Sequence, residues 1–405
     1  MKFLFPILLA SAVAGLSSAD DWPRFRGPEA DGISRETGWK ADWPDSEPQT
    51  IWEAQVGIGF SCVTVSEGRA YVTGHDGEDV ETLFCFDAAT GAEIWKHAYP
   101  HPLDDKYYEG GPTSTPTIHG DVVYLLTKRG TLFARKAADG AEVWTTNVAA
   151  ESGAAMPTWG FTGSPVVHGD LLLLTVGEAG TALDLASGTV KWKSGKAEAG
   201  YSTPVLFERD GETLMIVSNA REWVCVEPAT GAERWRFKWL TRYGVNAADP
   251  IVRGDEVFIA SGYEKGCALL KMTADGVEEI WKNKEMRSQM NPCILIGEHL
   301  YGIDGNQGGG GPRGAGLKCI TWETGEARWR ESSVGHGAPL VANGKLIVLG
   351  EKGELMIAPL SPDSFEPTLR VQILGGRCWT VPTLANGLLY ARNAKGHLVC
   401  VKLKE

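Results

Sequence analysis

The sequence lacks several features that mark common function classes. Lys and Arg number 39 against 51 Asp and Glu, which gives a net charge of −12, so the basic surface that a nucleic-acid binder needs is missing. No apolar run of about 18 residues follows the N-terminus, so we expect no transmembrane span in the mature protein. No Cys-x-x-Cys, Cys-x-x-Cys-His or adjacent cysteine pair occurs, which removes the short-range zinc, redox and haem-attachment signals.

The N-terminus has the pattern of a secretory signal peptide. One Lys precedes an apolar run from Phe3 to Leu16, and small residues continue to Ala19. This order of charged, apolar and small residues predicts cleavage after Ala19 and export to the periplasm or the cell exterior. Residues 20–49 are predicted to form an irregular N-terminal segment, and residues 50–405 a single folded domain.

A tryptophan recurs along the chain at intervals of 43 to 49 residues. Each copy follows a turn such as Thr90-Gly91 or Asp139-Gly140 by four or five positions. Gly supplies the positive φ of a tight hairpin, and the residue before it can hydrogen-bond the turn backbone. The repeated residues are Trp95, Trp144, Trp192, Trp235, Trp281 and Trp329.

The segments between these tryptophans predict the fold. Each period contains short apolar or alternating runs, such as 122–126 and 345–349, separated by Gly turns. They read as four antiparallel strands per period, and eight such periods predict an all-β, eight-bladed β-propeller. The eighth period ends after a third strand, so residues 50–57, which carry Trp52, are predicted to supply its fourth strand and close the ring.

The repeated phrase resembles a known motif. "CFDAATGAEIW" (85–95) is similar to the tryptophan-docking motif of the pyrroloquinoline-quinone (PQQ) propellers, which belong to the wider WD40/YVTN-like repeat class. The resemblance covers about residues 51–405 and implies that the tryptophans dock one blade on the next. "DWPRFRGP" (21–28) also resembles the segment before the propeller in exported bacterial PQQ-like proteins. That family includes quinoprotein alcohol dehydrogenases and the non-enzymatic assembly factor BamB, so it leaves function open.

The repeat register accounts for half of the eight cysteines. Cys85, Cys225 and Cys319 precede the turn glycine by six positions, and Cys400 is equivalent in the last period. Small residues at one repeated position indicate tight packing, and equivalent positions in separate blades lie too far apart for a disulfide. The disulfide status of the other four stays open from the sequence. These are Cys62, Cys267, Cys293 and Cys378.

Candidate ligand-binding residues gather in the loops that join one blade to the next. These loops share one face, opposite the docking turns, and they combine aromatic with polar side chains. A concave mouth of this composition can hold a planar, anionic or carbohydrate ligand, although the same residues can instead cap the loops. The candidates are Trp159, Arg242, Asn246, Asp249, Asn291, Arg377 and Trp379. No catalytic residue and no metal ligand is predicted.

The sequence therefore favours an exported scaffold or binding protein, with an envelope protein or a small molecule as its partner. A PQQ-dependent alcohol or sugar dehydrogenase is the first alternative, and a carbohydrate-binding propeller is the second. In the dehydrogenases the quinone lies against an adjacent-cysteine disulfide with Ca²⁺ beside it. This chain lacks such a pair, so we expect no cofactor, with PQQ and Ca²⁺ as the alternative.

Overall fold

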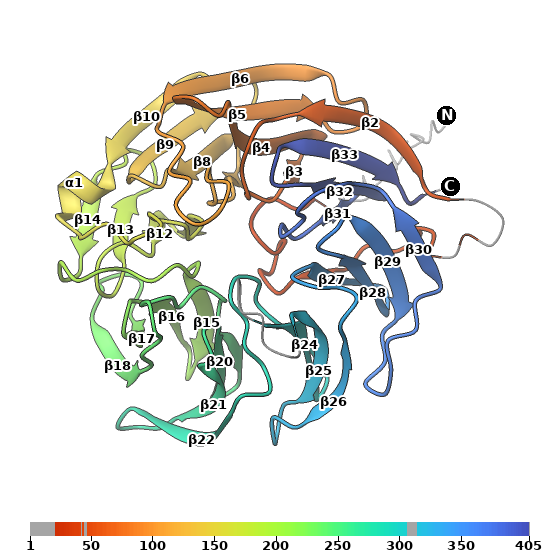
Figure 1. Cartoon of the computed structure of the whole chain (residues 1–405). Helices are drawn as coiled ribbons and strands as arrows, with labels where there is room; N and C mark the ends of the chain where they lie inside the picture. The colour runs from red at the N-terminus through yellow and green to blue at the C-terminus, as the bar shows by residue number, and fades with distance from the viewer. Residues whose placement is uncertain (1–20, 42, 44–46, 306–313, 405) are drawn as a thin grey trace, which may run out of the picture.

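The protein is a ring of eight antiparallel sheets, which confirms the predicted eight-bladed β-propeller (Figure 1). The computed structural model describes residues 21–41, 43, 47–305 and 314–404, so the predicted signal peptide lies outside the described residues. In each blade the first strand lies nearest the central channel and the fourth lies at the circumference. None of the described segments contains a helix long and apolar enough to cross a membrane.

The first four blades follow the chain in order. Blade 1 contains β3 (Thr64–Ser66), β4 (Arg69–His75), β5 (Val80–Asp87) and β6 (Glu93–Pro100). Blade 2 contains β7 (Thr117–His119), β8 (Val122–Leu126), β9 (Thr131–Lys136) and β10 (Glu142–Asn147), and the short helix α1 (Val148–Ser152) follows it. Blade 3 contains β11 (Val166–His168), β12 (Leu171–Leu174), β13 (Thr181–Asp184) and β14 (Val190–Lys193). Blade 4 contains β15 (Val205–Arg209), β16 (Glu212–Ser218), β17 (Glu222–Val226) and β18 (Glu233–Lys238).

The remaining blades bring the chain back to its start. Blade 5 contains β19 (Ile251–Arg253), β20 (Glu256–Ser261), β21 (Gly266–Met272) and β22 (Val277–Asn283). Blade 6 contains β23 (Ile294–Ile296), β24 (His299–Asp304), β25 (Gly316–Thr321) and β26 (Ala327–Glu331). Blade 7 contains β27 (Ala338–Ala342), β28 (Lys345–Leu349), β29 (Glu354–Pro359) and β30 (Leu369–Gln372). Blade 8 contains β31 (Thr383–Ala385), β32 (Leu388–Arg392) and β33 (His397–Lys402), with β2 (Gln49–Gln55) as its outer strand.

Two N-terminal strands tie the chain to the far end of the ring. β2 pairs antiparallel with β33 and sets Trp52 opposite Cys400, as the incomplete eighth period predicts. β1 (Ile33–Ser34) adds a parallel strand to the inner edge of blade 7. The closure of blade 8 removes two exposed sheet edges that would otherwise invite pairing with another chain.

The repeated tryptophans contact the next blade in a regular way. Six of the seven indole N–H groups donate to a backbone carbonyl in the following blade, over 2.8–3.1 Å. For five of these six a turn glycine of that blade lies against the indole: a Cβ on Gly140 would stand 2.7 Å from the Trp95 ring. Trp329 instead stacks on Phe365 of blade 7. Trp235 differs, because among the described residues its buried indole nitrogen has no partner and a Cβ on Gly276 of blade 5 would meet nothing within 4 Å.

All eight cysteines are buried free thiols, which answers the question that the sequence left open. Cys85, Cys225, Cys319 and Cys400 each pair across two strands with a repeated tryptophan. Burial raises the pKa of Cys85, Cys225 and Cys400 to about 12. Because the thiolate is the reactive form, these cysteines act as small packing residues.

Candidate functional site

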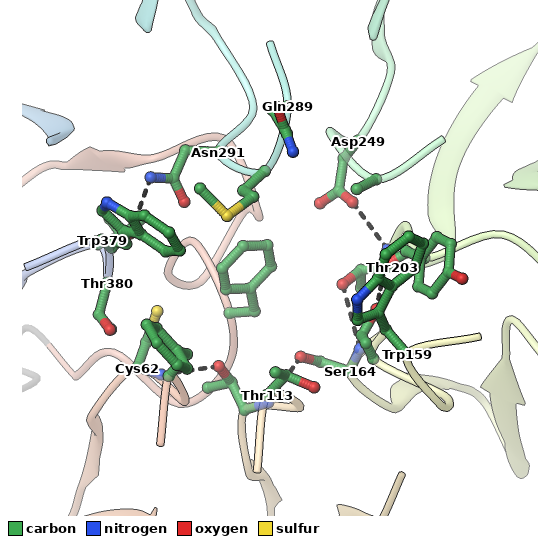
Figure 2. Close-up of a pocket in the computed structure, with 18 of the residues that line it drawn as sticks. Cys62, Thr113, Trp159, Ser164, Thr203, Asp249, Gln289, Asn291, Trp379 and Thr380 are labelled. Carbon is green, nitrogen blue, oxygen red and sulfur yellow. Dashed lines mark hydrogen bonds between the residues drawn. The ribbon is translucent and has the colours of Figure 1, made fainter. Parts of the chain in front are cut away.

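A pocket opens at the centre of the ring, on the face where the outer strand of one blade leads to the inner strand of the next (Figure 2). Its cavity volume is about 200 Å³. Lining residues come from the loop that leads into each blade except blade 7, and Tyr263 comes from a turn within blade 5. Seven of the lining residues are aromatic, eight are Ser, Thr, Asn or Gln, and one is charged. The lining consists of Phe25, Phe60, Cys62, Tyr108, Thr113, Thr115, Trp159, Thr162, Ser164, Tyr201, Thr203, Val245, Ala247, Asp249, Tyr263, Gln289, Met290, Asn291, Trp379, Thr380 and Val381.

The N-terminal segment before β1 contributes to the pocket. Trp22 forms a two-way backbone bridge with Val65 of β3, and the carbonyl of Pro23 accepts from Ile118 of β7. The segment then crosses the channel to β27, where the Val341 N–H donates to Gly32. Phe25 lies between these anchors and lines the pocket. The segment that precedes the propeller in the sequence is therefore part of the site.

A chain of hydrogen bonds links the loops of five consecutive blades around the pocket. The Cys62 N–H donates to Oγ1 of Thr115 over 3.0 Å, and the Thr115 N–H donates to Oγ of Ser164 over 3.0 Å. The Ser164 N–H donates to Oγ1 of Thr203 over 3.2 Å, and the Thr203 N–H donates to Oδ1 of Asp249 over 2.7 Å. We call these five residues the inter-blade chain. Because each side chain accepts its neighbour's backbone N–H, the lining is held in place before any ligand arrives.

Asp249 ends the inter-blade chain and is the one carboxylate in the lining. Its side chain is buried, and burial raises its pKa to about 7 despite the opposing charge of Arg26. Arg26 is itself buried, with one guanidinium nitrogen 2.6 Å from the Cys293 carbonyl and 2.9 Å from the Asp31 carbonyl. Figure 2 shows the Asp249 carboxylate directed into the pocket. Asp249 is thus a buried carboxyl group in the pocket wall, and the charge of Arg26, a residue outside the lining, opposes the rise of its pKa.

Trp379 and Trp159 form opposite walls of the pocket (Figure 2). The Trp379 indole N–H donates to Oε1 of Glu351 over 3.0 Å, and the Arg377 guanidinium lies 4.3 Å from the ring centroid on its face. Trp159 meets the Tyr201 ring edge-on at a centroid distance of 5.9 Å. These ring contacts, together with the hydrogen bond of Trp379, hold the two indoles in fixed orientations.

Two lining hydroxyl groups have no hydrogen-bond partner. Oγ1 of Thr113 and Oγ1 of Thr380 are shielded from solvent and bond to nothing in the protein. Most buried polar groups in native proteins are paired. An unpaired hydroxyl that lines a cavity is therefore suited to a polar ligand or a bound water.

The sequence candidates divide into two groups. Trp159, Asp249, Asn291 and Trp379 line the pocket together. The other three lie outside the lining. Arg377 stacks on Trp379 at the rim and pairs with Glu109. Arg242 is exposed and lies over the Tyr243 ring. Asn246 is fully buried and holds the loop by donating to the carbonyls of Asn219 and Trp239.

Several lining residues were not among the candidates. Phe25 comes from the segment expected to be irregular, and Phe60 and Tyr263 had no motif around them. The inter-blade chain did leave a signal: Thr115, Ser164, Thr203 and Asp249 each directly precede a proline that leads into an inner strand. A polar residue before this repeated proline is the pattern that would have found them.

The fold and site define an eight-bladed β-propeller with a preorganised pocket in its channel. Over residues 104–310 the sequence matches the family described as outer membrane protein assembly factor BamB, and the chain belongs to this family. No curated protein matches the sequence.

Similar solved structures include BamB and alcohol dehydrogenases. BamB from Moraxella catarrhalis has a TM-score of 0.62 at 16% identity, covering 89% of this chain and 99% of that one. The quinohemoprotein alcohol dehydrogenase from Comamonas testosteroni has a TM-score of 0.69 at 14% identity, covering 95% and 81%. A europium-containing methanol dehydrogenase has a TM-score of 0.62 at 13% identity, covering 94% and 89%. At these identities the likeness shows the fold alone.

The lining does not fit PQQ with Ca²⁺. Ca²⁺ takes six to eight oxygen ligands, usually from several carboxylates, and the lining has only Asp249, whose Oδ1 already accepts from Thr203. Among the described residues, no group of three or more His, Cys, Asp or Glu is arranged to hold a metal. PQQ carries three carboxylic acids, and no Lys, Arg or His lines the pocket. The aromatic walls suit a ring, but the charged groups that this pair of cofactors requires are missing.

Proposed function

We propose that the protein is an exported, non-catalytic binding protein of the bacterial envelope, which holds a small ligand in the channel pocket and offers the surrounding loop face to a protein partner. The observation that carries this proposal is the preorganised pocket, which has aromatic walls and lining hydroxyl groups that have no partner among the described residues. Concave, largely apolar cavities with a few directed polar groups are the usual small-molecule sites of proteins.

Membership of the BamB family supports a protein partner for the loop face. Large apolar side chains are exposed in the loops of this face, with Tyr107 79% and Met156 54% exposed, followed by Tyr243 and Leu240. Exposed apolar groups that gather on one face mark interaction surfaces. The outer rim of the pocket would then be the docking area, and the pocket itself would stay free for the small ligand.

Export is tested by the N-terminus of the mature protein. Expression of the full chain with its own residues 1–19 should yield protein outside the cytoplasm that begins at Asp20. N-terminal sequencing of the purified protein reads this out. An uncleaved protein that begins at Met1 and stays in the cytoplasm would contradict the export part of the proposal.

The ligand-binding function is tested by a thermal-shift screen of small polar molecules. A true ligand should raise the melting temperature of the wild type, and Trp379→Ala should abolish the shift because it removes one wall of the pocket. Tyr243→Ala, at an exposed loop position outside the lining, is the matched control and should keep the shift. If every ligand that shifts the wild type also shifts Trp379→Ala equally, the pocket is not the binding site.

The alternative is a PQQ-dependent oxidoreductase, and the solved dehydrogenase structures with the same fold favour it. The missing cations and calcium ligands of the lining speak against it. Titration with PQQ and CaCl₂, followed by dye-linked oxidation of small alcohols and sugars, separates the two. Saturable PQQ binding with turnover would replace the binding-protein proposal by the enzyme.

A further inference from the structure

The charge and the polar groups of the pocket lining bear on the chemical class of the ligand. We infer that its ligand is an uncharged, hydroxyl-rich ring, a sugar, and that it excludes organic anions. This inference rests on the proposed binding function and names the ligand class of the same pocket. Three independent features of the lining lead to it: its charge, its free hydrogen-bonding groups and its aromatic walls.

The charge of the lining disfavours an anion. None of the described Lys, Arg or His residues lines the pocket, and the one acidic residue in the lining is Asp249. The nearby cations have other partners. Lys128 donates to the Tyr108 hydroxyl, Arg377 pairs with Glu109, and Arg26, outside the lining, donates to the Cys293 and Asp31 carbonyls. A carboxylate or phosphate ligand would lose its hydration in the pocket without gaining a charged partner, which is strongly unfavourable.

The same charges also disfavour a cation. Aromatic walls with one carboxylate can hold an ammonium group. Here burial raises the pKa of Asp249 to about 7, and the buried Arg26 opposes its charge. A ligand ammonium would therefore gain no full counter-charge at neutral pH, whereas a neutral ligand needs none.

Several of the free polar groups of the lining are hydroxyls. Oγ1 of Thr113 and Oγ1 of Thr380 have no hydrogen-bond partner among the described residues. Thr115 and Ser164 accept a backbone N–H, so each keeps its own hydroxyl proton for a further bond. Hydroxyl groups act as donor and acceptor at once, and a ring of ligand hydroxyls offers the same dual chemistry at several points. This complementarity suits a polyol. The carboxylates of PQQ can only accept hydrogen bonds, so they match these hydroxyl groups less well.

The walls suit a saturated ring. Trp159 and Trp379 stand on opposite sides of the pocket with their orientations fixed by neighbours (Figure 2). Aromatic side chains offer large rigid apolar area at low entropic cost. A sugar has an apolar C–H face that can lie on an indole while its hydroxyls reach the threonines. The inter-blade chain holds the hydroxyl groups of Thr115, Ser164 and Thr203 at fixed positions in the pocket wall.

The test compares probes of three charges on the full mature protein. Calorimetric titrations with D-glucose, N-acetyl-D-glucosamine and maltose represent neutral rings, PQQ represents the anion and choline represents the cation. We expect saturable binding of at least one sugar and none of PQQ or choline. Trp159→Ala and Trp379→Ala should each weaken the sugar about tenfold or more, and Thr380→Val should weaken it roughly threefold to tenfold.

Thr175→Val provides the matched control. The Thr175 hydroxyl is likewise buried and unpaired, but it does not line the pocket. This variant should bind the sugar as the wild type does, so loss of a buried hydroxyl alone cannot explain an effect of Thr380→Val. Circular dichroism of each variant verifies folding.

Each other result has a defined meaning. If PQQ or choline binds in a Trp379-dependent way and no sugar does, the binding function stands and the neutral-ligand inference is wrong. If no probe of any class binds, the sugar inference fails, and if the wider thermal-shift screen also finds no ligand, the binding function fails with it. Sugar binding that survives both Trp159→Ala and Trp379→Ala would put the sugar site outside this pocket and overturn the inference.

Discussion

The backbone N–H of Thr203 donates to Oδ1 of Asp249 over 2.7 Å, across the boundary between blades 4 and 5. This contact ends the inter-blade chain on its one carboxyl group, Asp249. The loops on both sides of the pocket are thereby connected to a titratable group. Stability and pocket order should both depend on the state of that carboxyl.

The pH dependence of stability tests the burial of Asp249. Its pKa is about 7 in the folded protein, against 3.8 for an ordinary Asp. A carboxyl whose folded pKa is raised contributes stability that is fully present below pH 4 and is lost as the pH rises to about 7. Asp249→Asn keeps an acceptor for Thr203 and does not ionise, so it should gain stability relative to the wild type over this window, by at most roughly 4 kcal/mol.

Urea unfolding at pH 5 and pH 8 provides the measurement. Asp363→Asn, at an exposed position in a surface ion pair with Arg328, serves as the control and should show no such trend. The wild type and Asp249→Asn could instead differ in free energy of unfolding by the same amount at both pH values. Asp249 would then stay ionised throughout, with Arg26 as its full counter-charge.

The docking role of the repeated tryptophans is a second prediction. Trp95→Ala and Trp235→Ala should each lower the free energy of unfolding by about 3–5 kcal/mol, as for other buried aromatic residues. The phenylalanine variants separate packing from hydrogen bonding. Trp95 donates to the Ala137 carbonyl over 2.9 Å, whereas the buried Trp235 nitrogen has no partner. Trp95→Phe should therefore cost about 1 kcal/mol more than Trp235→Phe.

Chemical denaturation of the four variants measures these differences. Both indoles are buried to a similar degree, at 8% and 6% exposed, so the comparison is matched for area. Equal costs for the two phenylalanine variants would show that the inter-blade hydrogen bond adds nothing to docking.

The architecture could be predicted from the sequence because the same pattern of turn glycine and tryptophan recurs in most of the blades. The period of the tryptophans predicted the eight blades, and the orphan segment with Trp52 predicted the closure by β2. Trp235 packs against blade 5, but among the described residues its indole nitrogen has no hydrogen-bond partner. The blade 5 turn has one more residue between Gly276 and Trp281 than the turn of blade 1 has between Gly91 and Trp95, and a Cβ on Gly276 would meet nothing within 4 Å.

The pocket was less predictable, because side-chain direction within a loop depends on packing. Trp159 and Asn246 looked alike as polar or aromatic loop residues, yet one lines the cavity and the other anchors its own loop. Phe25 and Arg26 reach the channel only because the segment around them bridges β3 and β27. Nothing in their local sequence repeats, so no period could reveal this contact.

The close packing of turn glycines on the tryptophans gives a third prediction. Gly91 and Gly68 share a φ of +73°, so alanine at either position meets the same backbone strain, worth about 1–2 kcal/mol. A Cβ on Gly91 would stand 2.6 Å from the Trp52 ring, whereas a Cβ on Gly68 would meet nothing. Gly91→Ala should therefore destabilise by roughly 1–3 kcal/mol more than Gly68→Ala. Thermal and urea unfolding of both variants measures the difference, and equal losses would indicate that the blades can separate slightly at no cost.

Ring closure depends on a buried arginine, which gives the last prediction. Arg392 of β32 is almost fully buried, and its guanidinium donates to the Thr73 carbonyl over 2.6 Å and the Gly57 carbonyl over 2.8 Å. Thr73 belongs to β4 of blade 1 and Gly57 to the loop that leads from β2 to blade 1, so one side chain joins the last blade to the first. Burial without a carboxylate partner lowers its pKa to about 10, which still leaves it charged at neutral pH.

Arg392→Met keeps the length of the side chain and removes all its donors. It should destabilise the protein by roughly 2–5 kcal/mol, because the Gly57 carbonyl loses its side-chain donor and the Thr73 carbonyl keeps only the longer bond from Ser61 Oγ, at 3.3 Å. Arg370→Met, which removes an exposed pair with Glu354, is the control and should cost less than about 1 kcal/mol. Limited proteolysis should also cut Arg392→Met faster near β2, since a ring that opens between blades 8 and 1 exposes that strand first. Unfolding and cleavage rates equal to those of Arg370→Met would mean that strand pairing by β2 closes the ring without help from Arg392.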